Sequence, residues 1–115
     1  MPVTLYHNPR CSKSRATLAL LEDRGIAPDV IEYLKTPPNA ATLATVIDKL
    51  GIDATHLMRT GEAEYQAAKD ELDTMNEPER IAWLCANPRV IERPIVVTDH
   101  AARIGRPPEA VLEIL

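Results

Sequence analysis

The residues best suited to covalent chemistry surround Cys11. Arg10, Lys13 and Arg15 flank it, and all three are positively charged at neutral pH. A turn precedes the cysteine and a helical pattern begins at Ser12, so Cys11 is predicted at the start of a helix. Unpaired backbone N–H groups and the helix dipole stabilise negative charge there. We therefore predict that Cys11 is a reactive thiolate rather than an inert buried thiol.

Two familiar cysteine motifs are absent around this residue. A thioredoxin-type dithiol needs a second cysteine at position 14, where this sequence has Ser14. A phosphatase loop of the C-x5-R type needs arginine at position 17, where Thr17 stands, and Arg15 comes two residues too early. A single thiol must therefore do the chemistry, and the reducing equivalents must come from another molecule.

Three more arginines lie at predicted element boundaries: Arg59, Arg93 and Arg106. The last two directly precede prolines. The planar guanidinium donates hydrogen bonds in a fork that matches tetrahedral oxyanions. An arginine is more often a solvated surface residue, so spacing alone leaves open whether these three bind an anion at Cys11.

The composition indicates a single small domain with no general affinity for anions. The chain has 115 residues, 26% of them charged, and a net charge of −4. This balance gives no bulk attraction to nucleic acid or to an anionic membrane, so an anionic substrate needs a local cationic site. No apolar run reaches the length of a bilayer span. Two distant cysteines, Cys11 and Cys85, form no disulfide framework, which fits a reducing cytoplasm.

The first third of the chain has the pattern of a βαβ unit. Residues 3–7 are β-branched and aromatic, which predicts a buried strand. A helix follows from Ser12 and ends before Gly25. Residues 30–34 predict a second strand, parallel to the first with a right-handed crossover.

A helical insertion is expected over about residues 39–88. Leu43, Val46, Ile47 and Leu50 follow helical spacing, and Asn76 resembles an N-cap with Pro78 in the first turn. After the insertion, residues 95–98 and 102–104 predict two strands, and Pro108 opens a terminal helix. The fold class is therefore α/β, βαβ then ββα around a small mixed sheet, as one domain over residues 1–115.

Several segments, in the same order, resemble the ArsC-type arsenate reductases that are coupled to glutaredoxin. The residues from His7 to Arg15 resemble the H-N-P-x-C-x-x-S-R signature of that family. The remaining segments, which cover most of the chain, are similar to its other motifs: Tyr33-Leu34-Lys35-Thr36-Pro37-Pro38, Leu57-Met58-Arg59, Glu92-Arg93-Pro94-Ile95-Val96-Val97, Gly105-Arg106-Pro107-Pro108-Glu109 and Val111-Leu112-Glu113-Ile114-Leu115.

This resemblance implies a thioredoxin/glutaredoxin-like fold and a specific reaction. Cys11 would attack arsenate, or a similar oxyanion, while Arg59, Arg93 and Arg106 hold the anion and its intermediates. Glutathione, as co-substrate, would attack the cysteine–arsenic adduct, and glutaredoxin would resolve the mixed disulfide and release arsenite. The family resemblance implies no tightly bound cofactor, and the scattered histidines and cysteines show no metal-ligand spacing.

Five residues receive supporting roles from the same resemblance. His7 matches the histidine near the nucleophile, where an imidazolium would lower the thiol pKa or a neutral ring would orient the loop. Ser14 would donate to the thiolate or cap the helix. Arg15 would hold the loop, and Asn8 would form a side-chain turn bond. Pro94 resembles the cis-proline that faces the active thiol in thioredoxin-like folds, although sequence alone favours a trans bond.

The sequence differs from the best-known members of the family in two features, and two alternative functions stay open. Ser12-Lys13 stands where the best-known members have Gly-Thr, and those members continue beyond the position of Leu115. In both features this sequence is more similar to a sister group of ArsC-like proteins. One alternative is an Spx-type regulator that binds RNA polymerase, although Ser14 removes the redox C-x-x-C typical of that group. The other is a glutathione-dependent thiol oxidoreductase with a different substrate.

Overall fold

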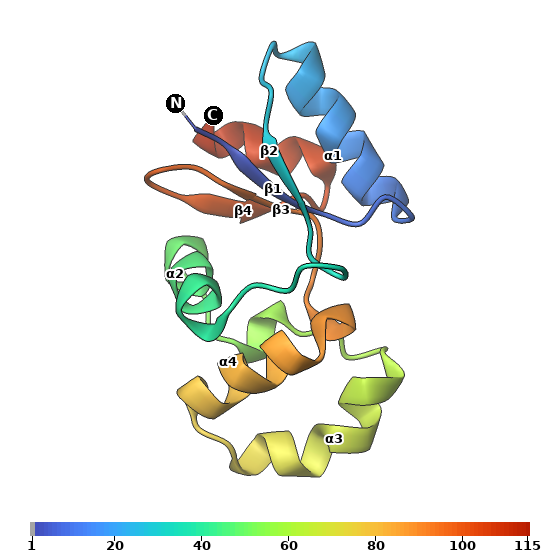
Figure 1. Ribbon diagram of the computed structural model, residues 1–115, viewed down its shortest axis with the longest axis vertical. Coiled ribbons are helices and arrows are strands. Elements are labelled where there is room, and N and C mark those ends of the chain that lie inside the picture. Colours follow the sequence, from blue (N-terminus) through green and yellow to red (C-terminus); the bar gives the residue numbers. More distant parts are fainter. Residues whose placement is uncertain (1) are drawn as a thin grey trace. The chain divides into compact units, whose positions relative to one another are not determined.

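A computed structural model describes residues 2–115. The chain divides into two compact units, one formed by Met1–Thr36 with Arg93–Leu115 and the other by Pro37–Glu92. The first unit contains the sheet and the second contains helices (Figure 1). The second unit corresponds to the predicted helical insertion over about residues 39–88, while the prediction of a single domain stays a prediction.

The first unit is built on the small mixed sheet that the sequence predicted. Strand β1 pairs in parallel with β2 and antiparallel with β3, and β4 pairs antiparallel with β3, so the strand order is β2-β1-β3-β4. The elements of this unit are β1 (Thr4–His7), α1 (Ser12–Asp23), β2 (Asp29–Glu32), β3 (Ile95–Val97), β4 (Ala102–Ile104) and the 3₁₀ helix η3 (Pro108–Ile114).

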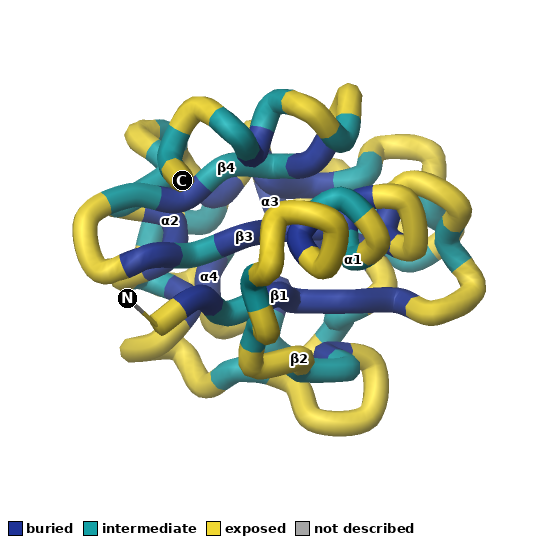
Figure 2. Tube along the Cα trace, turned by 90° about the horizontal axis from the view of Figure 1, so that it is seen from above, coloured by how far each residue is buried: buried dark blue, intermediate teal, exposed yellow. Residues whose placement is uncertain are grey.

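One face of the sheet forms a hydrophobic core with α1 and η3. Leu5 of β1 lies opposite Val96 of β3 in the register, so both side chains project from the same face. They join Leu21 of α1 and Val111 of η3 in one cluster, and all four are fully buried. Each such side chain contributes roughly 1.5–3 kcal/mol by burial. The inner strand β1 is accordingly buried from residue 5 to residue 7, whereas the edge strand β2 is partly exposed (Figure 2).

Helix α1 begins at Ser12, directly after the cysteine, and ends before Gly25, as the sequence predicted. Cys11 is the N-cap residue, and its backbone is extended (φ −93°, ψ 123°). Gly25 follows the C-cap with a φ of +72°, a left-handed conformation that glycine adopts without a steric penalty. Its N–H donates to the carbonyl of Glu22 at 2.9 Å and so satisfies one of the last helical acceptors.

The second unit consists of short helices, and two of them have side-chain caps at their N-termini. Asn39 accepts a hydrogen bond from the Thr42 N–H at 2.8 Å. Asn76 forms a reciprocal capping box with Glu79, which confirms the predicted N-cap. The helices are α2 (Ala40–Leu50), η1 (Thr55–Leu57), α3 (Ala63–Thr74), α4 (Glu77–Ala86) and η2 (Pro88–Val90).

Two predictions were wrong in detail: the end of the second strand and the type of the terminal helix. The second strand ends at Glu32 rather than at residue 34, because the Lys35 and Thr36 N–H groups both turn back to the Glu32 carbonyl. Within the predicted helical insertion, residues 55–57 form only a single 3₁₀ turn. The terminal helix is also 3₁₀ over its seven residues, a form common in short helical segments.

Candidate active site

The loop between β1 and α1 is closed by hydrogen bonds around Asn8. The Cys11 N–H donates to the Asn8 carbonyl at 3.0 Å, and the Arg10 N–H donates to Asn8 Oδ1 at 3.0 Å. The second bond is a side-chain turn of the type that asparagine favours. Arg15 ties the helix to the same loop, because its Nη1 donates to the Pro9 carbonyl at 2.9 Å. These bonds fix the backbone that leads into the cysteine.

A buried polar network lies beneath this loop. Ser14 Oγ lies 2.7 Å from His7 Nδ1 and accepts a hydrogen bond from the Asn8 N–H at 3.0 Å. Burial lowers the pKa of His7; the nearby Glu32 carboxylate raises it and the Arg15 guanidinium lowers it further, with a net decrease. The imidazole is therefore neutral at pH 7. This arrangement favours the loop-orienting role of His7 over the imidazolium role, and it engages the Ser14 hydroxyl with His7 and the Asn8 N–H.

The pKa of the Cys11 thiol is below its ordinary value. Burial is the largest influence and by itself raises the pKa. The backbone N–H groups of Ser14 and Lys13 and the guanidinium of Arg93 more than offset this by stabilising the thiolate. These N–H groups belong to the first turn of α1, where they have no partner within the helix. The local structure thus favours the nucleophilic form of the sulfur.

Two of the predicted arginines lie at this sulfur. Arg106 Nη2 is 3.7 Å from Cys11 Sγ, and its Nε donates to the Arg93 carbonyl at 2.8 Å. The guanidinium is therefore oriented by backbone while it faces the thiol. The Arg93–Pro94 and Arg106–Pro107 peptide bonds are both cis, the first as the resemblance implied.

Close packing at Gly105 brings these arginine-bearing segments together. Its N–H donates to the Pro94 carbonyl at 2.9 Å. A Cβ at this position would lie 2.5 Å from Thr17 Oγ1 and 2.8 Å from Pro94 Cγ, which is closer than side-chain carbons approach such atoms. Sequence reasoning missed Gly105 and Thr17 as positioning residues. The available signal was a glycine directly before Arg106 and a threonine on the apolar side of α1.

Arg59, the third predicted arginine, belongs to the other unit. Its Nε lies 3.6 Å from Glu62 Oε1 and its Nη1 lies 3.4 Å from Glu92 Oε1. Its backbone N–H donates to the Val90 carbonyl at 2.7 Å. Apart from Arg59, the seven other predicted site residues all lie in the first unit with Cys11, and the backbone N–H of Lys13 joins them at the sulfur: His7, Asn8, Ser14, Arg15, Arg93, Pro94 and Arg106.

The remaining cysteine has a different environment. Cys85 is half-buried on α4, and burial raises the pKa of its thiol, so it is the less reactive of the two. Within residues 2–115 no three His, Cys, Asp or Glu side chains converge as a metal site would require. The same stretch contains no helix with the length and apolar character needed to cross a membrane.

The sheet and the thiol site together define the class of this protein. A mixed four-stranded sheet places one activated cysteine at the N-terminus of α1, faced by arginine guanidinium groups. This is a thiol protein of thioredoxin-like fold with one activated cysteine. The model of the ArsC family matches residues 6–114, and the chain belongs to that family.

Similar proteins agree with this membership over their whole length. The chain is 49% identical to the Escherichia coli protein named "Uncharacterized protein YfgD", covering 98% of this chain and 96% of that one. It is 46% identical to an arsenate reductase of Haemophilus influenzae, with both chains fully covered. The structure of an arsenate reductase from Vibrio cholerae superposes with a TM-score of 0.95 at 47% identity, covering 100% of this chain and 98% of that one. These matches confirm the predicted fold class.

Proposed function

We propose that this protein reduces arsenate to arsenite through the Cys11 thiolate. The observation that best supports the proposal is the placement of Arg106 Nη2 at 3.7 Å from Cys11 Sγ, beside a sulfur whose pKa is lowered. Full-length relatives that are named arsenate reductases support the same substrate.

The proposed chemistry is a two-electron reduction supplied by two thiols. The Cys11 sulfur attacks arsenic, a sulfur–arsenic bond forms, and one arsenate oxygen leaves as water. A glutathione thiol then attacks this adduct, so that As(V) becomes As(III) while the two sulfurs are oxidised to a disulfide. In sum, Cys11-SH, glutathione and H₃AsO₄ give the Cys11–glutathione disulfide, H₃AsO₃ and water. A glutaredoxin thiol reduces that disulfide and regenerates Cys11.

The remaining residues divide into anion ligands and positioning groups. Arg93 and Arg106 bind the oxyanion next to the sulfur, since guanidinium groups match tetrahedral oxyanions. Arg59 completes the set, a role that rests on the family resemblance. His7, Asn8, Ser14 and Arg15 keep the loop in the shape that directs N–H groups at the thiolate. Pro94 packs against Gly105, which directly precedes Arg106.

The proposed partners follow from the same reaction. Glutathione is the co-substrate and a glutaredoxin is the protein partner. Both are cytoplasmic reductants, which fits a cytoplasmic location, and the reaction needs neither a nucleic acid nor a membrane surface. The reaction also needs no tightly bound cofactor, because both electrons come from thiols.

An assay with purified protein tests the proposal. Arsenite formation is measured with arsenate, glutathione and glutaredoxin supplied, for the wild type and for Cys11→Ser. The wild type should turn over and Cys11→Ser should be inactive, while Cys85→Ser, which removes the less reactive thiol, should retain activity. Turnover by Cys11→Ser, or a wild type that fails to form arsenite with both reductants present, would refute the proposal.

A further inference from the structure

An open pocket of about 190 Å³ borders the nucleophile loop within the first unit. One wall is the loop itself, including Pro9 and Arg10. The other wall is the end of β2 and the turn after it, including Glu32, Leu34 and Lys35. Arg10 directly precedes Cys11, and the Cα atoms of adjacent residues are about 3.8 Å apart. The pocket therefore borders the loop that carries Cys11, and of its lining residues Pro9 and Arg10 lie closest to Cys11 in the sequence. None of the groups that lower the pKa of the Cys11 thiol lines this pocket.

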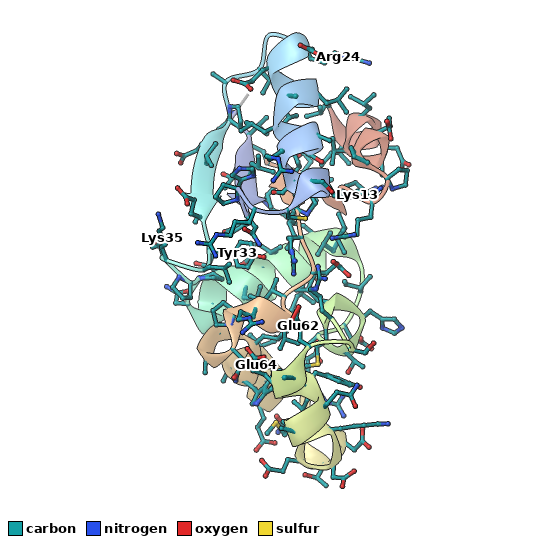
Figure 3. The ribbon with its side chains drawn as sticks, turned by 90° about the vertical axis from the view of Figure 1, so that its right-hand side faces the viewer. Lys13, Arg24, Tyr33, Lys35, Glu62 and Glu64 are labelled. Atoms are coloured by element: carbon teal, nitrogen blue, oxygen red, sulfur yellow. The ribbon has the colours of Figure 1, made fainter. Side chains whose placement is uncertain are left out.

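The pocket combines an apolar surface with charges of both signs. Leu34 is one of the few large hydrophobic residues that are exposed, at 40% of its surface. Arg10 and Lys35 supply two positive charges and Glu32 supplies one negative charge. Lys35 Nζ lies 3.5 Å from Glu32 Oε1, but the Lys35 side chain is largely exposed and that of Glu32 is partly exposed. An ion pair that is open to solvent in this way is weak. It can therefore break, so that Lys35 and Glu32 each pair with an opposite charge on a ligand. Figure 3 shows the Lys35 side chain extending outward from the ribbon.

We propose that this pocket binds the glutathione that the proposed reaction consumes. Glutathione has two carboxylates and one ammonium group, and the pocket offers two cations and one anion. Its peptide backbone and methylene groups fit against Leu34 and Pro9. An extended tripeptide spans roughly 10 Å, so its central thiol reaches the Cys11 sulfur while its ends stay among the charges. This inference rests on the proposed function for the identity of the thiol.

The pocket can be tested without arsenate by using oxidised glutathione. The Cys11 thiolate attacks one sulfur of the glutathione disulfide, the old S–S bond breaks, and a Cys11–glutathione disulfide and one glutathione thiolate form. No additional oxidant or reductant is needed. The rate of this exchange, followed by the mass increase of the full-length protein, reports recognition of glutathione beside Cys11. Alkylation by neutral iodoacetamide reports the reactivity of the thiolate itself.

Two variants change the pocket, and a third is a charge-matched control. Lys35→Glu reverses a cation, and Leu34→Ala removes apolar surface without changing charge. Arg24→Glu makes the same charge change as Lys35→Glu, but at the end of α1 that lies away from Lys13 and the cysteine (Figure 3). We expect Lys35→Glu and Leu34→Ala each to slow glutathionylation about five- to tenfold, as lost charge and apolar contacts of ordinary strength imply. Arg24→Glu should change the rate less than twofold.

A second disulfide separates recognition from general electrostatics. Dithiobis(nitrobenzoate) is also a dianion but lacks the peptide, so its exchange rate should fall much less in Leu34→Ala than the rate with oxidised glutathione. In Cys11→Ser, S-methylglutathione should shift the amide NMR signals of residues 8–10 and 32–35. The pocket assignment would be overturned if Leu34→Ala lost the same factor in exchange rate with both disulfides. NMR shifts confined to residues outside 8–10 and 32–35 would also overturn it.

The two proposals fail separately. Pocket-dependent glutathionylation without arsenite formation would leave the pocket assignment intact and remove the proposed function. Arsenite formation with a glutathione KM that is unchanged in Lys35→Glu and Leu34→Ala would leave the function intact and remove the pocket.

Discussion

The arginines of the two units are held by different means. In the sheet unit, the Arg106 Nε donates to a backbone carbonyl and its Nη2 faces the Cys11 sulfur. In the helical unit, the Arg59 guanidinium is paired with two carboxylates, from Glu62 and Glu92. The first arrangement follows from backbone that is locked by hydrogen bonds and close packing. The second depends on side chains with their own rotamer freedom, so we expect it to be more adaptable and less sensitive to single changes.

The largest effect should come from Arg106, because it contacts the reacting sulfur. Arg106→Ala should reduce the kcat for arsenate reduction by roughly 10²–10³, the usual cost of losing one donor that stabilises a developing oxyanion. Steady-state assays with glutathione and glutaredoxin measure this kcat. The control is Arg103→Ala, which removes a partly exposed arginine paired with Glu113. A loss of less than threefold in Arg106→Ala would show that the contact with sulfur does not reflect anion binding.

The packing that brings the first unit's arginines together should also be sensitive. Gly105→Ala forces a methyl group toward Thr17 Oγ1 and Pro94 Cγ, and overpacking of this kind costs about 1–3 kcal/mol. Urea denaturation should show this loss of unfolding free energy. Gly61→Ala is the matched control, because a Cβ there meets nothing within 4 Å and its backbone is not left-handed. Equal stability of the two variants would contradict the packing argument.

The difference between the units also shows how far sequence reasoning reaches. Cys11 was predictable because strand, turn and helix signals around it are local, and a helix N-terminus has a fixed chemistry. The mixed sheet was predictable from hydrophobic patterns and the right-handed crossover rule. The fit of Gly105 between Thr17 and Pro94 was not, because it joins residues almost ninety positions apart and depends on atomic packing. The pairing of Arg59 with Glu62 and Glu92 likewise appears only once the chain has folded.

The thiol pKa tests whether Arg93 acts on the sulfur. The rate of Cys11 alkylation rises with pH as the thiolate forms, and the midpoint should be lower in the folded protein than in the urea-unfolded chain. Removing a positive charge and a hydrogen-bond donor from the thiolate disfavours the charged form, so Arg93→Ala should shift the midpoint to higher pH and slow alkylation at pH 7. Arg103→Ala should leave the midpoint in place. An unchanged midpoint in Arg93→Ala would mean that the helix N–H groups alone activate Cys11.

The smallest effect is expected from the carboxylates that pair with Arg59. Glu62 and Glu64 lie two residues apart in the helical unit (Figure 3). Glu62 pairs with both Arg59 and Arg89, whereas Glu64 contacts Arg89 at 3.7 Å. Such partly exposed pairs contribute about 0.2–1 kcal/mol each, so Glu62→Gln should change the arsenate KM by up to about fivefold and leave kcat nearly constant.

Glu64→Gln is the matched control for that change, because it alters the same type of side chain near the same Arg89 without touching Arg59. We expect its arsenate KM to stay within about 1.5-fold of the wild type, since the lost pair is exposed and weak. If Glu62→Gln lowers kcat as strongly as Arg106→Ala, the ion pairs fix Arg59 as tightly as backbone fixes Arg106. If Glu64→Gln has the same effect as Glu62→Gln, the effect arises from the general charge of α3 rather than from orientation of the Arg59 guanidinium.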